Sequence, residues 1–398
     1  MAKTYEEKLA DVLVEHSFGN VDFRKEWEKN ERALVFARYS GLSDPVVRAV
    51  ANRVWVAGGA VRFSPEPEWK ERDFLRHASE FTRTQQARGY ELEGVNHTAA
   101  RLVILDTPNT QASATVDPTR RVAFRRSRKT IRDELLRVDS ITGEFIHPWC
   151  ITIYPTQAYA QDMGMPLEEA AEIIYRAMLL DADDPVQAWK DLTAEQQKLI
   201  DKVFVKAKKV EIYHPDGTHL EANVEGHKWK NSNGVANFPS GEIFTSPRKY
   251  SVNGVIKFTK LPQYDHGGPE VSGIELRYRR GKLVKGTAKI GQAYLEQFFE
   301  IPGTDYLGEV ALGTNRNITR MTRQILLDEK MGGAIHIALG GAYKGLGDPK
   351  DLNESVAHWD MIKPMRGGYV QVTTKDNKVY KLTWNDKQGL WRPRKIAA

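Results

Sequence analysis

The spacing of apolar and polar positions changes about halfway along this chain of 398 residues. In the first half, β-branched runs at 33–39, 60–64, 100–106 and 150–156 alternate with amphipathic stretches such as 43–59, where apolar residues recur at helical spacing. Strands that alternate with helices in this way are typical of a parallel sheet covered by helices. The first half is therefore predicted to be an α/β domain.

A helical region is predicted after Pro166. Proline is favoured at the first position of a helix, and Glu168 and Glu169 follow in the first turn, where the helix dipole stabilises negative charge. A chain of this length exceeds what one hydrophobic core usually serves. We therefore expect two domains: residues 1–200, an α/β domain that ends in a helical linker, and residues 201–398, a β-rich domain that carries the site.

The second half is predicted to be mainly antiparallel β within an α+β domain. Short runs alternate apolar and polar residues at a period of two, and they are separated by the turn signals PDG, NG, GG and RRGK. Such a pattern indicates antiparallel strands, here expected to form a closed or strongly curved sheet. Two helices are expected to interrupt the strands, at 293–300 and at 318–330.

The chain is basic, with a formal net charge of +6 and a pI near 9.1. Basic residues cluster at 119–132 and at 277–289. We interpret the first cluster as an exposed helix start and the second as a strand pair with basic outward positions, because no RNP, helix-turn-helix or zinc-finger spacing accompanies them. No nucleic-acid partner is expected, although a non-catalytic nucleic-acid-binding protein stays an alternative.

The compartment is suggested by what the sequence lacks. No apolar run is long enough to span a bilayer, and the charged N-terminus does not follow the order of a secretory signal. The single cysteine, Cys150, excludes an internal disulfide and is expected to be a buried, inert thiol in a strand rather than a nucleophile. These features predict a cytoplasmic protein with no membrane partner.

Two glutamates of the second half stand in short strands next to turns. Glu242 follows a Ser-Gly turn in NFPSGEIFTSP, where a solvated side chain is the ordinary interpretation. Glu309 lies in the apolar run 307–312, between glycines. Burying a carboxylate in such a run costs several kcal/mol unless it is paired or coordinated. Glu309 is therefore the stronger candidate for a functional role.

Further candidates come from two later segments. In DEKMGGAIHIALGGAY, Glu329 ends a predicted helix and His336 begins an apolar strand, where a core histidine is the alternative. In SVAHWD at 355–360, His358 and Asp360 are two residues apart, so a strand would project both from one face and Trp359 from the other. That arrangement suits two metal ligands, and equally an ordinary His–Asp hydrogen bond.

Taken together, these segments supply four carboxylates and two imidazoles. If they were gathered in one place without a cation, mutual repulsion and desolvation would be unfavourable, and two divalent metal ions resolve that problem. Mixed carboxylate and imidazole ligation suits zinc or cobalt first, with manganese or magnesium as alternatives. The predicted metal ligands are Glu242, Glu309, Glu329, His336, His358 and Asp360.

The same segments resemble a known family. GEIFTSP, YLGEVALGTN, the DEK-GG-HIALG-Y run and N-x-S-x-x-HWDMI resemble the signature segments of peptidase family M29, the metallo-aminopeptidases of the aminopeptidase T and S type, and 151–189 resembles its central segment. The resemblance implies a two-metal site that removes N-terminal amino acids from peptides. It also implies homodimers, places the six candidates on metal-ligand positions with Glu309 shared, and places Tyr343 on the active-site tyrosine.

A mechanism follows from this resemblance as a hypothesis. Two metal ions would activate a water molecule, one of them would hold the free α-amine of the substrate, and Tyr343 would donate a hydrogen bond to the developing oxyanion. Either Glu309 or Glu329 could accept the proton of the water. A metal-dependent hydrolase of another ester or phosphate substrate, with the same ligands, is the nearer alternative. The glycine-rich loop 344–353 leaves the substrate preference unread.

Overall fold

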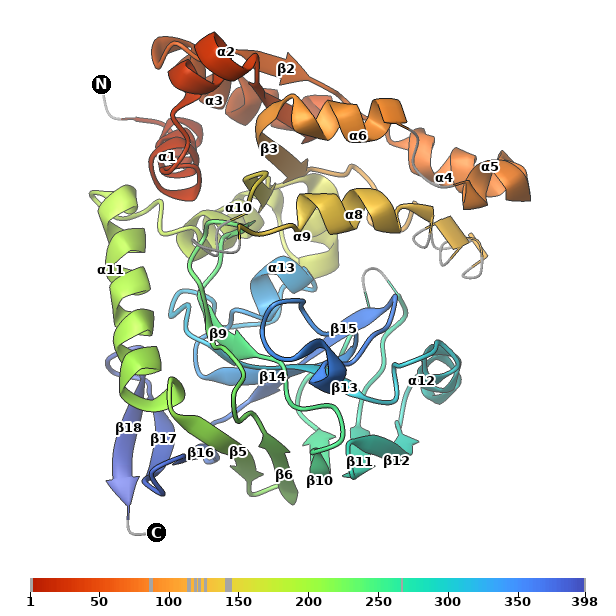
Figure 1. Ribbon diagram of the computed structural model, residues 1–398, viewed down its shortest axis with the longest axis vertical. Helices are drawn as coiled ribbons and strands as arrows, with labels where there is room; N and C mark the ends of the chain where they lie inside the picture. Colours follow the sequence, from red (N-terminus) through yellow and green to blue (C-terminus); the bar gives the residue numbers. More distant parts are fainter. Residues whose placement is uncertain are drawn as a thin grey trace. The chain divides into compact units, whose positions relative to one another are not determined.

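The computed structural model forms two compact units (Figure 1), residues 1–190 with 234–239, and residues 191–233 with 240–398. We keep the division into domains at residue 200 as a proposal. The described residues are 3–85, 89–112, 116–117, 120, 123–124, 127–139, 145–265 and 268–396.

The first unit contains a five-stranded, all-parallel sheet with the strand order β2-β1-β3-β4-β8. The four strands predicted in this half are confirmed, and the α/β class with them. The last strand was missed because it is two residues long and comes from the second half of the sequence. The strands are β1 (Ala33–Arg38), β2 (Val61–Phe63), β3 (Thr98–Leu105), β4 (Trp149–Ile153) and β8 (Asn237–Phe238).

Helix α3 of the first unit buries one apolar stripe. In α3, Val46, Val50 and Val54 are fully buried at helical spacing, which is the stripe that the sequence predicts. Cys150 on β4 is fully buried as expected, and burial raises the pKa of its thiol to about 12. The helices are α1 (Tyr5–Val12), η1 (Leu13–Ser17), α2 (Phe23–Asn30), η2 (Gly41–Ser43), α3 (Asp44–Val56), α4 (Trp69–His77), α5 (Glu80–Thr84), α6 (Gly89–Asn96), α8 (Lys129–Leu135), α9 (Gln157–Met163) and α10 (Leu167–Ala177).

The second unit begins within α11 (Pro185–Leu199), which continues as η3 (Ile200–Phe204), and contains an eight-stranded antiparallel sheet. Its strand order is β12-β11-β10-β6-β5-β16-β17-β18. The strands are β5 (Ala207–His214), β6 (Thr218–Asn223), β10 (Asn253–Phe258), β11 (Ile274–Arg279), β12 (Lys282–Thr287), β16 (Tyr369–Thr374), β17 (Val379–Asn385) and β18 (Leu390–Ile396).

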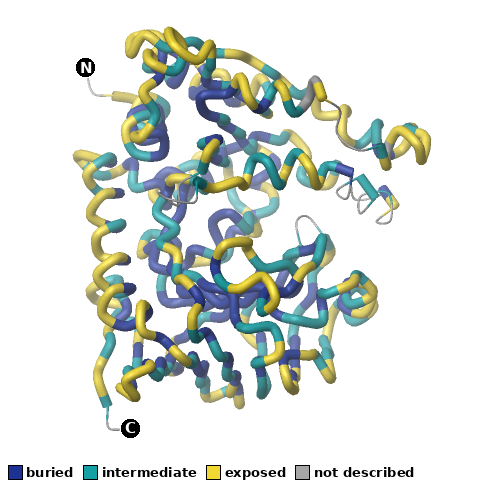
Figure 2. The backbone as a smooth tube through the Cα atoms, viewed as in Figure 1, coloured by how far each residue is buried: buried dark blue, intermediate teal, exposed yellow. Residues whose placement is uncertain are grey.

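A second antiparallel sheet in the same unit, of five strands, has the order β15-β14-β13-β9-β7. Both sheets contribute to one hydrophobic core, for example through Ile212 and Val372 from the first and Ile337 and Trp359 from the second. The dark blue segments of β13, β14 and β15 in Figure 2 belong to this core. The strands are β7 (Lys230–Ser232), β9 (Glu242–Thr245), β13 (Leu307–Gly313), β14 (Ala334–Gly340) and β15 (His358–Pro364).

Two expectations for this unit need correction. The antiparallel strands form two sheets that share a core, not one closed or strongly curved sheet, because each sheet has one apolar face to bury. The expected helix at 293–300 is confirmed as α12 (Gln292–Phe299), but the one at 318–330 shrinks to α13 (Ile325–Asp328). There the Asp328 carboxylate accepts hydrogen bonds from Thr322 N and Oγ1, both at 2.7 Å, and Arg323 has a φ of +63°, which ends helical geometry.

The structure describes one of the two basic clusters fully and the other only in part. The run at 277–289 falls on the β11–β12 strand pair, as predicted. The run at 119–132 lies partly outside the described residues, and its last residues begin α8. Among the helices that the structure describes, none is long and apolar enough to cross a membrane.

Candidate metal centre

One face of the five-stranded sheet carries nearly all of the candidate ligands. Ile243, Val310 and Ile337 point into the core, so the residues that alternate with them project from the opposite face. Across the ladders each candidate ligand on these strands has a glycine or alanine as a direct neighbour, which leaves space above the sheet. The neighbouring pairs are Glu242 with Gly313, His336 with Ala311, Glu309 and Asp360 with Ala338, and His358 with Gly340.

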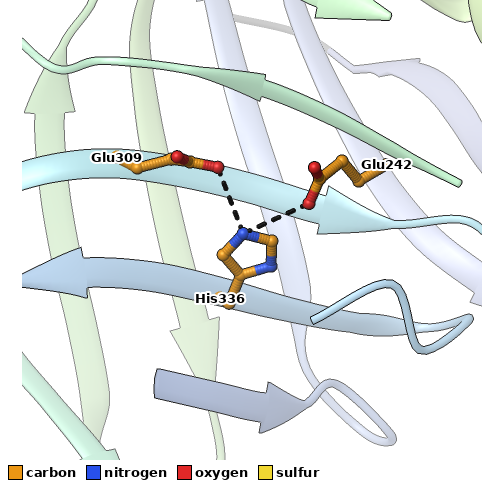
Figure 3. Close-up of side chains that lie close together, drawn as sticks. All are labelled: Glu242, Glu309 and His336. Carbon is orange, nitrogen blue, oxygen red and sulfur yellow. Dashed lines mark hydrogen bonds and ion pairs between the residues drawn. The ribbon is translucent and has the colours of Figure 1, made fainter. Parts of the chain in front are cut away.

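A first triplet consists of Glu242, Glu309 and His336 (Figure 3). His336 Nε2 lies 3.2 Å from Glu309 Oε1 and 3.3 Å from Glu242 Oε2. The three side chains come from neighbouring strands, β9, β13 and β14, and they point toward one another. All three are buried, so this is an interior arrangement of two carboxylates around one imidazole.

A second triplet consists of Glu309, His358 and Asp360. His358 Nε2 lies 3.3 Å from Asp360 Oδ1 and 3.6 Å from Glu309 Oε2. His358 Nδ1 donates a hydrogen bond of 2.7 Å to the Gly341 carbonyl, which leaves Nε2 as the ring nitrogen that faces the carboxylates. The two oxygens of Glu309 therefore face different imidazoles, and Glu309 is common to both triplets.

The electrostatics of the cluster are unfavourable without added positive charge. Glu242, Glu309 and Asp360 are between 3% and 5% exposed. Burial raises the pKa of Glu309. Burial opposes protonation of the imidazoles, yet the carboxylates, Glu309 foremost for His336 and Asp360 for His358, raise the pKa of His336 to about 9 and that of His358 to about 10. The imidazoles of the metal-free protein therefore hold protons at neutral pH.

The donor set fits divalent cations. Glu242 Oε2, Asp360 Oδ1 and His336 Nδ1 are buried and have no hydrogen-bond partner among the described residues. Buried polar atoms are rarely left without a hydrogen-bond partner, so buried carboxylate oxygens that converge on one place without a hydrogen-bond donor are suited to hold a cation. Carboxylate oxygens with imidazole nitrogens are the ligands that zinc, cobalt and manganese accept.

This electrostatic arrangement predicts proton release when metal binds. A metal ion needs the deprotonated imidazole, and the raised pKa values mean that protons compete with the metal up to about pH 9. Adding Zn²⁺ to the metal-free protein at pH 7 in weak buffer is expected to release protons, and the apparent affinity is expected to fall as the pH is lowered. A pH-stat titration measures the release, and zinc binding without proton release would contradict the prediction.

A second prediction tests the two triplets independently of each other. The variant His358→Ala is expected to lose one of the two proposed ions and keep the other, because the first triplet does not contain His358. Metal content measured by mass spectrometry checks this result. His227→Ala is a matched control, since His227 Nδ1 also donates 2.7 Å to a carbonyl, that of Ser246, and His227 is in neither triplet. Unchanged metal content in His358→Ala would mean that His358 only hydrogen-bonds to Asp360.

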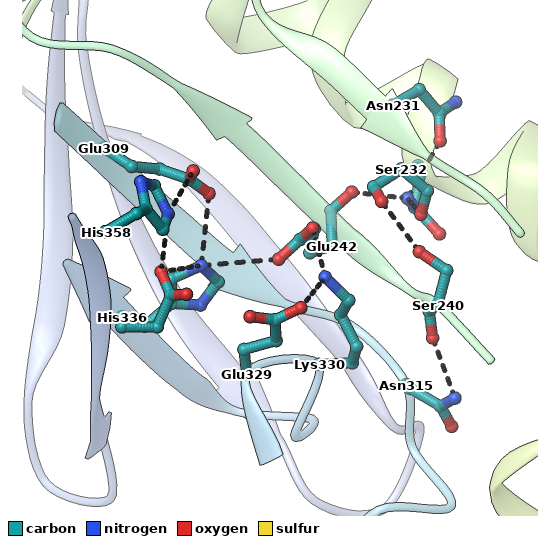
Figure 4. A network of polar contacts seen from close by, with 12 residues as sticks. Asn231, Ser232, Ser240, Glu242, Glu309, Asn315, Glu329, Lys330, His336 and His358 are labelled. Atoms are coloured by element: carbon teal, nitrogen blue, oxygen red, sulfur yellow. Dashed lines mark hydrogen bonds and ion pairs between the residues drawn. The ribbon is translucent and has the colours of Figure 1, made fainter. Parts of the chain in front are cut away.

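Glu329 lies beside the two triplets and in neither of them. Its carboxylate pairs instead with Lys330, whose Nζ lies 2.5 Å from Glu329 Oε1 and 2.5 Å from Glu242 Oε1 (Figure 4). Burial, moderated by Lys330, raises the pKa of Glu329 to about 8. Sequence reasoning missed Lys330, because a lysine at the end of a polar helix is usually solvated, and only its burial to 1% exposure distinguishes it.

Tyr343 stands over the cluster on the loop that follows β14. Its ring centroid lies 5.4 Å from that of Phe244 and 5.6 Å from that of His358. Asn353 closes the loop, because its Nδ2 donates to the carbonyls of Gly303 and Gly340 at 2.7 and 2.6 Å. Desolvation, and after it the charge of Glu309, raises the pKa of Tyr343 well above its usual value, so the phenol keeps its proton. Phe244 was not predicted, although it shares a face with Glu242 on β9.

The strand that carries Glu242 is held by a buried polar network (Figure 4). Gln196 Nε2 donates to the Glu242 carbonyl at 2.8 Å, and Asn315 Nδ2 donates to the Ser240 carbonyl at 2.9 Å. Gly241 has a φ of +113°, and a Cβ there would lie 2.8 Å from the Asn315 Cβ. The predicted Ser-Gly turn thus requires glycine for both its conformation and its space, and it sets the direction in which Glu242 leaves the turn.

The parallel sheet with its helices, the two antiparallel sheets and this carboxylate–imidazole centre together define an α/β protein with a candidate metal centre. Residues 3–385 match the family of thermophilic metalloproteases (M29), so the chain belongs to that family and is a peptidase whose family uses divalent metal.

Comparisons with individual proteins agree with this family. The chain is 28% identical over 371 residues to aminopeptidase 2 of Geobacillus stearothermophilus, covering 84% of this chain and 87% of that protein. It is 32% identical over 228 residues to aminopeptidase T of Thermus thermophilus, covering 52% of this chain and 54% of that protein. The structure of wild-type AmpT from Thermus thermophilus has the same fold, with a TM-score of 0.75, 23% identity, and coverage of 97% and 98% of the two chains.

Proposed function

We propose that the protein is a metal-dependent aminopeptidase that removes N-terminal amino acids from peptides with the help of two divalent ions, zinc or cobalt. The observation that carries the proposal is the pair of triplets joined by Glu309, whose Oε1 faces His336 and whose Oε2 faces His358. A carboxylate that faces two separate nitrogen donors is suited to bridge two cations. The aminopeptidase names of the relatives support the exopeptidase reaction.

The residues of the two triplets would hold the ions, Glu242, Glu309 and His336 on one side and Glu309, His358 and Asp360 on the other. When bound, such ions lower the pKa of water and polarise a carbonyl. The chain contributes the rest. Its carboxylates favour the positively charged α-amine of a peptide, and the buried position of Glu309 and His336 keeps bulk water away from the reacting groups.

Tyr343 is proposed to donate a hydrogen bond to the oxyanion that develops on the scissile carbonyl. The phenol stays protonated because its pKa is raised, and its ring packs against those of Phe244 and His358. The residue is 41% exposed, so a peptide can reach it. A neutral donor that is already in place costs no reorganisation during the reaction.

Glu329 is proposed to accept the proton of the attacking water, in preference to Glu309. Both oxygens of Glu309 face imidazoles within the triplets, at 3.2 and 3.6 Å. Glu329 belongs to neither triplet, and only its Oε1 pairs with Lys330. A carboxylate with one oxygen held and the other available can take a proton and pass it to the leaving amine, and the positive charge of bound ions would lower the raised pKa of Glu329 so that it is ionised for this task.

One assay tests the function against its alternatives. Hydrolysis of aminoacyl p-nitroanilides is measured with free and N-blocked substrates, before and after chelation and metal readdition. The proposal expects cleavage of free substrates only, lost on chelation and restored by metal. Equal cleavage of N-blocked substrates contradicts recognition of the amine, and activity confined to p-nitrophenyl esters or phosphates would indicate the other hydrolase. Salt-sensitive nucleic-acid binding without metal-dependent hydrolysis would favour the binding protein.

We further propose a cytoplasmic homodimer that binds peptides and no nucleic acid. A single buried cysteine suits a reducing compartment. The dimer rests on the family resemblance. Light scattering on the eluted protein measures its mass, and a mass equal to one chain of 45.2 kDa would contradict the dimer.

A further inference from the structure

Lys330 is a fully buried lysine beside the candidate metal centre. It lies two residues beyond α13, is 1% exposed, and its carbonyl accepts a hydrogen bond of 3.0 Å from Asn315 N. Its ammonium group contacts two carboxylates, Glu242 and Glu329, each at 2.5 Å. An ammonium group has only donors, so both contacts fix one oxygen of a carboxylate as a hydrogen-bond acceptor.

Because Lys330 contacts Glu242, the two carboxylate oxygens of Glu242 have different neighbours. Oε1 accepts from Lys330 Nζ, whereas Oε2 faces His336 Nε2 at 3.3 Å and has no hydrogen-bond partner (Figure 4). A glutamate without such a partner can bind a cation through both oxygens. With Oε1 held by an ammonium group, only Oε2 is available toward the first triplet.

The second contact of Lys330 is with Glu329, the fourth carboxylate near the centre. Glu329 lies close enough to Asp360 and Glu242 for their charges to act on it, yet it contributes to neither triplet. Its Oε1 is bound by the same ammonium group that holds Glu242. One lysine therefore contacts both a candidate ligand and the carboxylate beside it.

We propose that Lys330 is a positioning residue that gives two neighbouring carboxylates different tasks. It restricts Glu242 to one ligating oxygen and it holds Glu329 beside the centre, where Glu329 can accept a proton without ligating. The proposal rests on the two-ion function proposed above. It differs from a plain structural ion pair, because a structural pair would contribute to folding and leave the coordination of the ions unchanged.

The chain offers a matched control for this distinction. Lys363 on β15 is also buried, at 3% exposure, and its Nζ lies 2.6 Å from Asp216 Oδ2 and 2.7 Å from the Lys257 carbonyl. None of these partners belongs to the triplets. Removing Lys363 breaks a buried lysine–carboxylate pair of the same kind without touching the candidate ligands.

The test is the visible absorption of the full-length protein loaded with Co²⁺, compared for wild type, Lys330→Met, Lys330→Gln and Lys363→Met. Cobalt absorption reports coordination number, because six-coordinate Co²⁺ absorbs much more weakly than four- or five-coordinate Co²⁺. In Lys330→Met, Glu242 Oε1 and Glu329 are released toward the ions, so we expect a loss of absorption per bound ion. Metal affinity or kcat is expected to fall about 10- to 100-fold, as for other outer partners of metal sites.

The control variants distinguish a role of Lys330 in positioning the carboxylates from a role in the stability of the fold. Lys330→Gln keeps an N–H donor and is expected to retain more of the wild-type spectrum than Lys330→Met, and it serves as the test variant if Lys330→Met does not fold. Lys363→Met is expected to lose stability and keep the spectrum. In Lys330→Met, the additional change Glu329→Gln is expected to restore part of the absorption. A wild-type spectrum in Lys330→Met and Lys330→Gln, at full cobalt loading, would overturn the proposal.

The cobalt spectra, measured together with activity, show whether the role of Lys330 or the aminopeptidase function has failed. If the wild type binds two Co²⁺ ions and cleaves no aminoacyl substrate, the aminopeptidase function fails while the role of Lys330 in coordination is still measured. If activity is present and the spectra of the Lys330 variants match wild type, only the role of Lys330 fails.

Discussion

The variant Glu309→Gln is expected to lose nearly all activity together with both metal ions. Glu309 is the only residue common to the two triplets among the described residues, and its oxygens face His336 and His358. Loss of a residue that only hydrogen-bonds to a metal ligand costs about 10- to 100-fold in metal affinity or activity, so removing the proposed shared ligand of two ions should lower kcat/KM by at least about 10³-fold. Metal content and hydrolysis of an unblocked aminoacyl p-nitroanilide measure the two effects.

A matched control for this change is Glu211→Gln. Glu211 on β5 is similarly buried, at 6% exposure, and its carboxylate accepts hydrogen bonds from Tyr213 and Gln371 at 2.9 Å each. It lies in the other sheet of the same unit, so its loss is expected to affect stability and leave metal content unchanged. Undiminished activity in Glu309→Gln would remove Glu309 from the centre of the site.

The variant Tyr343→Phe is expected to lower kcat about 10²- to 10³-fold, which is the usual cost of removing one oxyanion donor. The ring of Tyr343 contacts Phe244 and His358, and phenylalanine keeps those contacts. KM and metal content should therefore change little, because the hydroxyl is proposed to act on charge that develops only in the transition state. Steady-state kinetics on a series of unblocked substrates separate kcat from KM.

Tyr294→Phe is the control for the loss of a phenol. The Tyr294 hydroxyl donates 2.9 Å to Asp265 Oδ2, and its ring packs against Trp359 on the core side of β15. Removal of the Tyr294 hydroxyl is expected to leave kcat within about twofold of wild type, since substitutions away from a functional site usually have small effects. If kcat of Tyr343→Phe also stayed within that range, Tyr343 would be a packing residue at the end of a strand.

Much of the site could be predicted because its strands obey a local rule. In HWD, alternation along a strand places His358 and Asp360 on one face, and the structure confirms that they share a face while Trp359 is buried in the core at 1% exposure. The isolated Glu309 in an apolar strand was informative for the same reason, since a buried carboxylate needs a partner. Local periodicity and the cost of burying charge act within a few residues, so they can be recognised in the sequence.

Other features depend on residues that are distant along the chain. The helix expected at 318–330 failed because Asp328 binds Thr322 and draws the preceding segment out of helical geometry. β8 escaped notice because two residues carry no periodicity, and only its pairing with β4 makes it a strand. In both cases contacts with residues elsewhere in the chain decide the secondary structure against the preference of the local sequence.

The sequence by itself determined the α/β and β-rich classes of the two halves and the chemical types gathered at the centre. Those properties follow from periodicity and from the identity of side chains. Only the tertiary structure decided how the carboxylates divide, with Glu309 common to two triplets, Glu329 outside both, and Lys330 buried between Glu329 and Glu242. The physical reason is that strand register brings side chains from β9, β13, β14 and β15 within a few ångströms, and register is a property of paired strands that no single segment encodes.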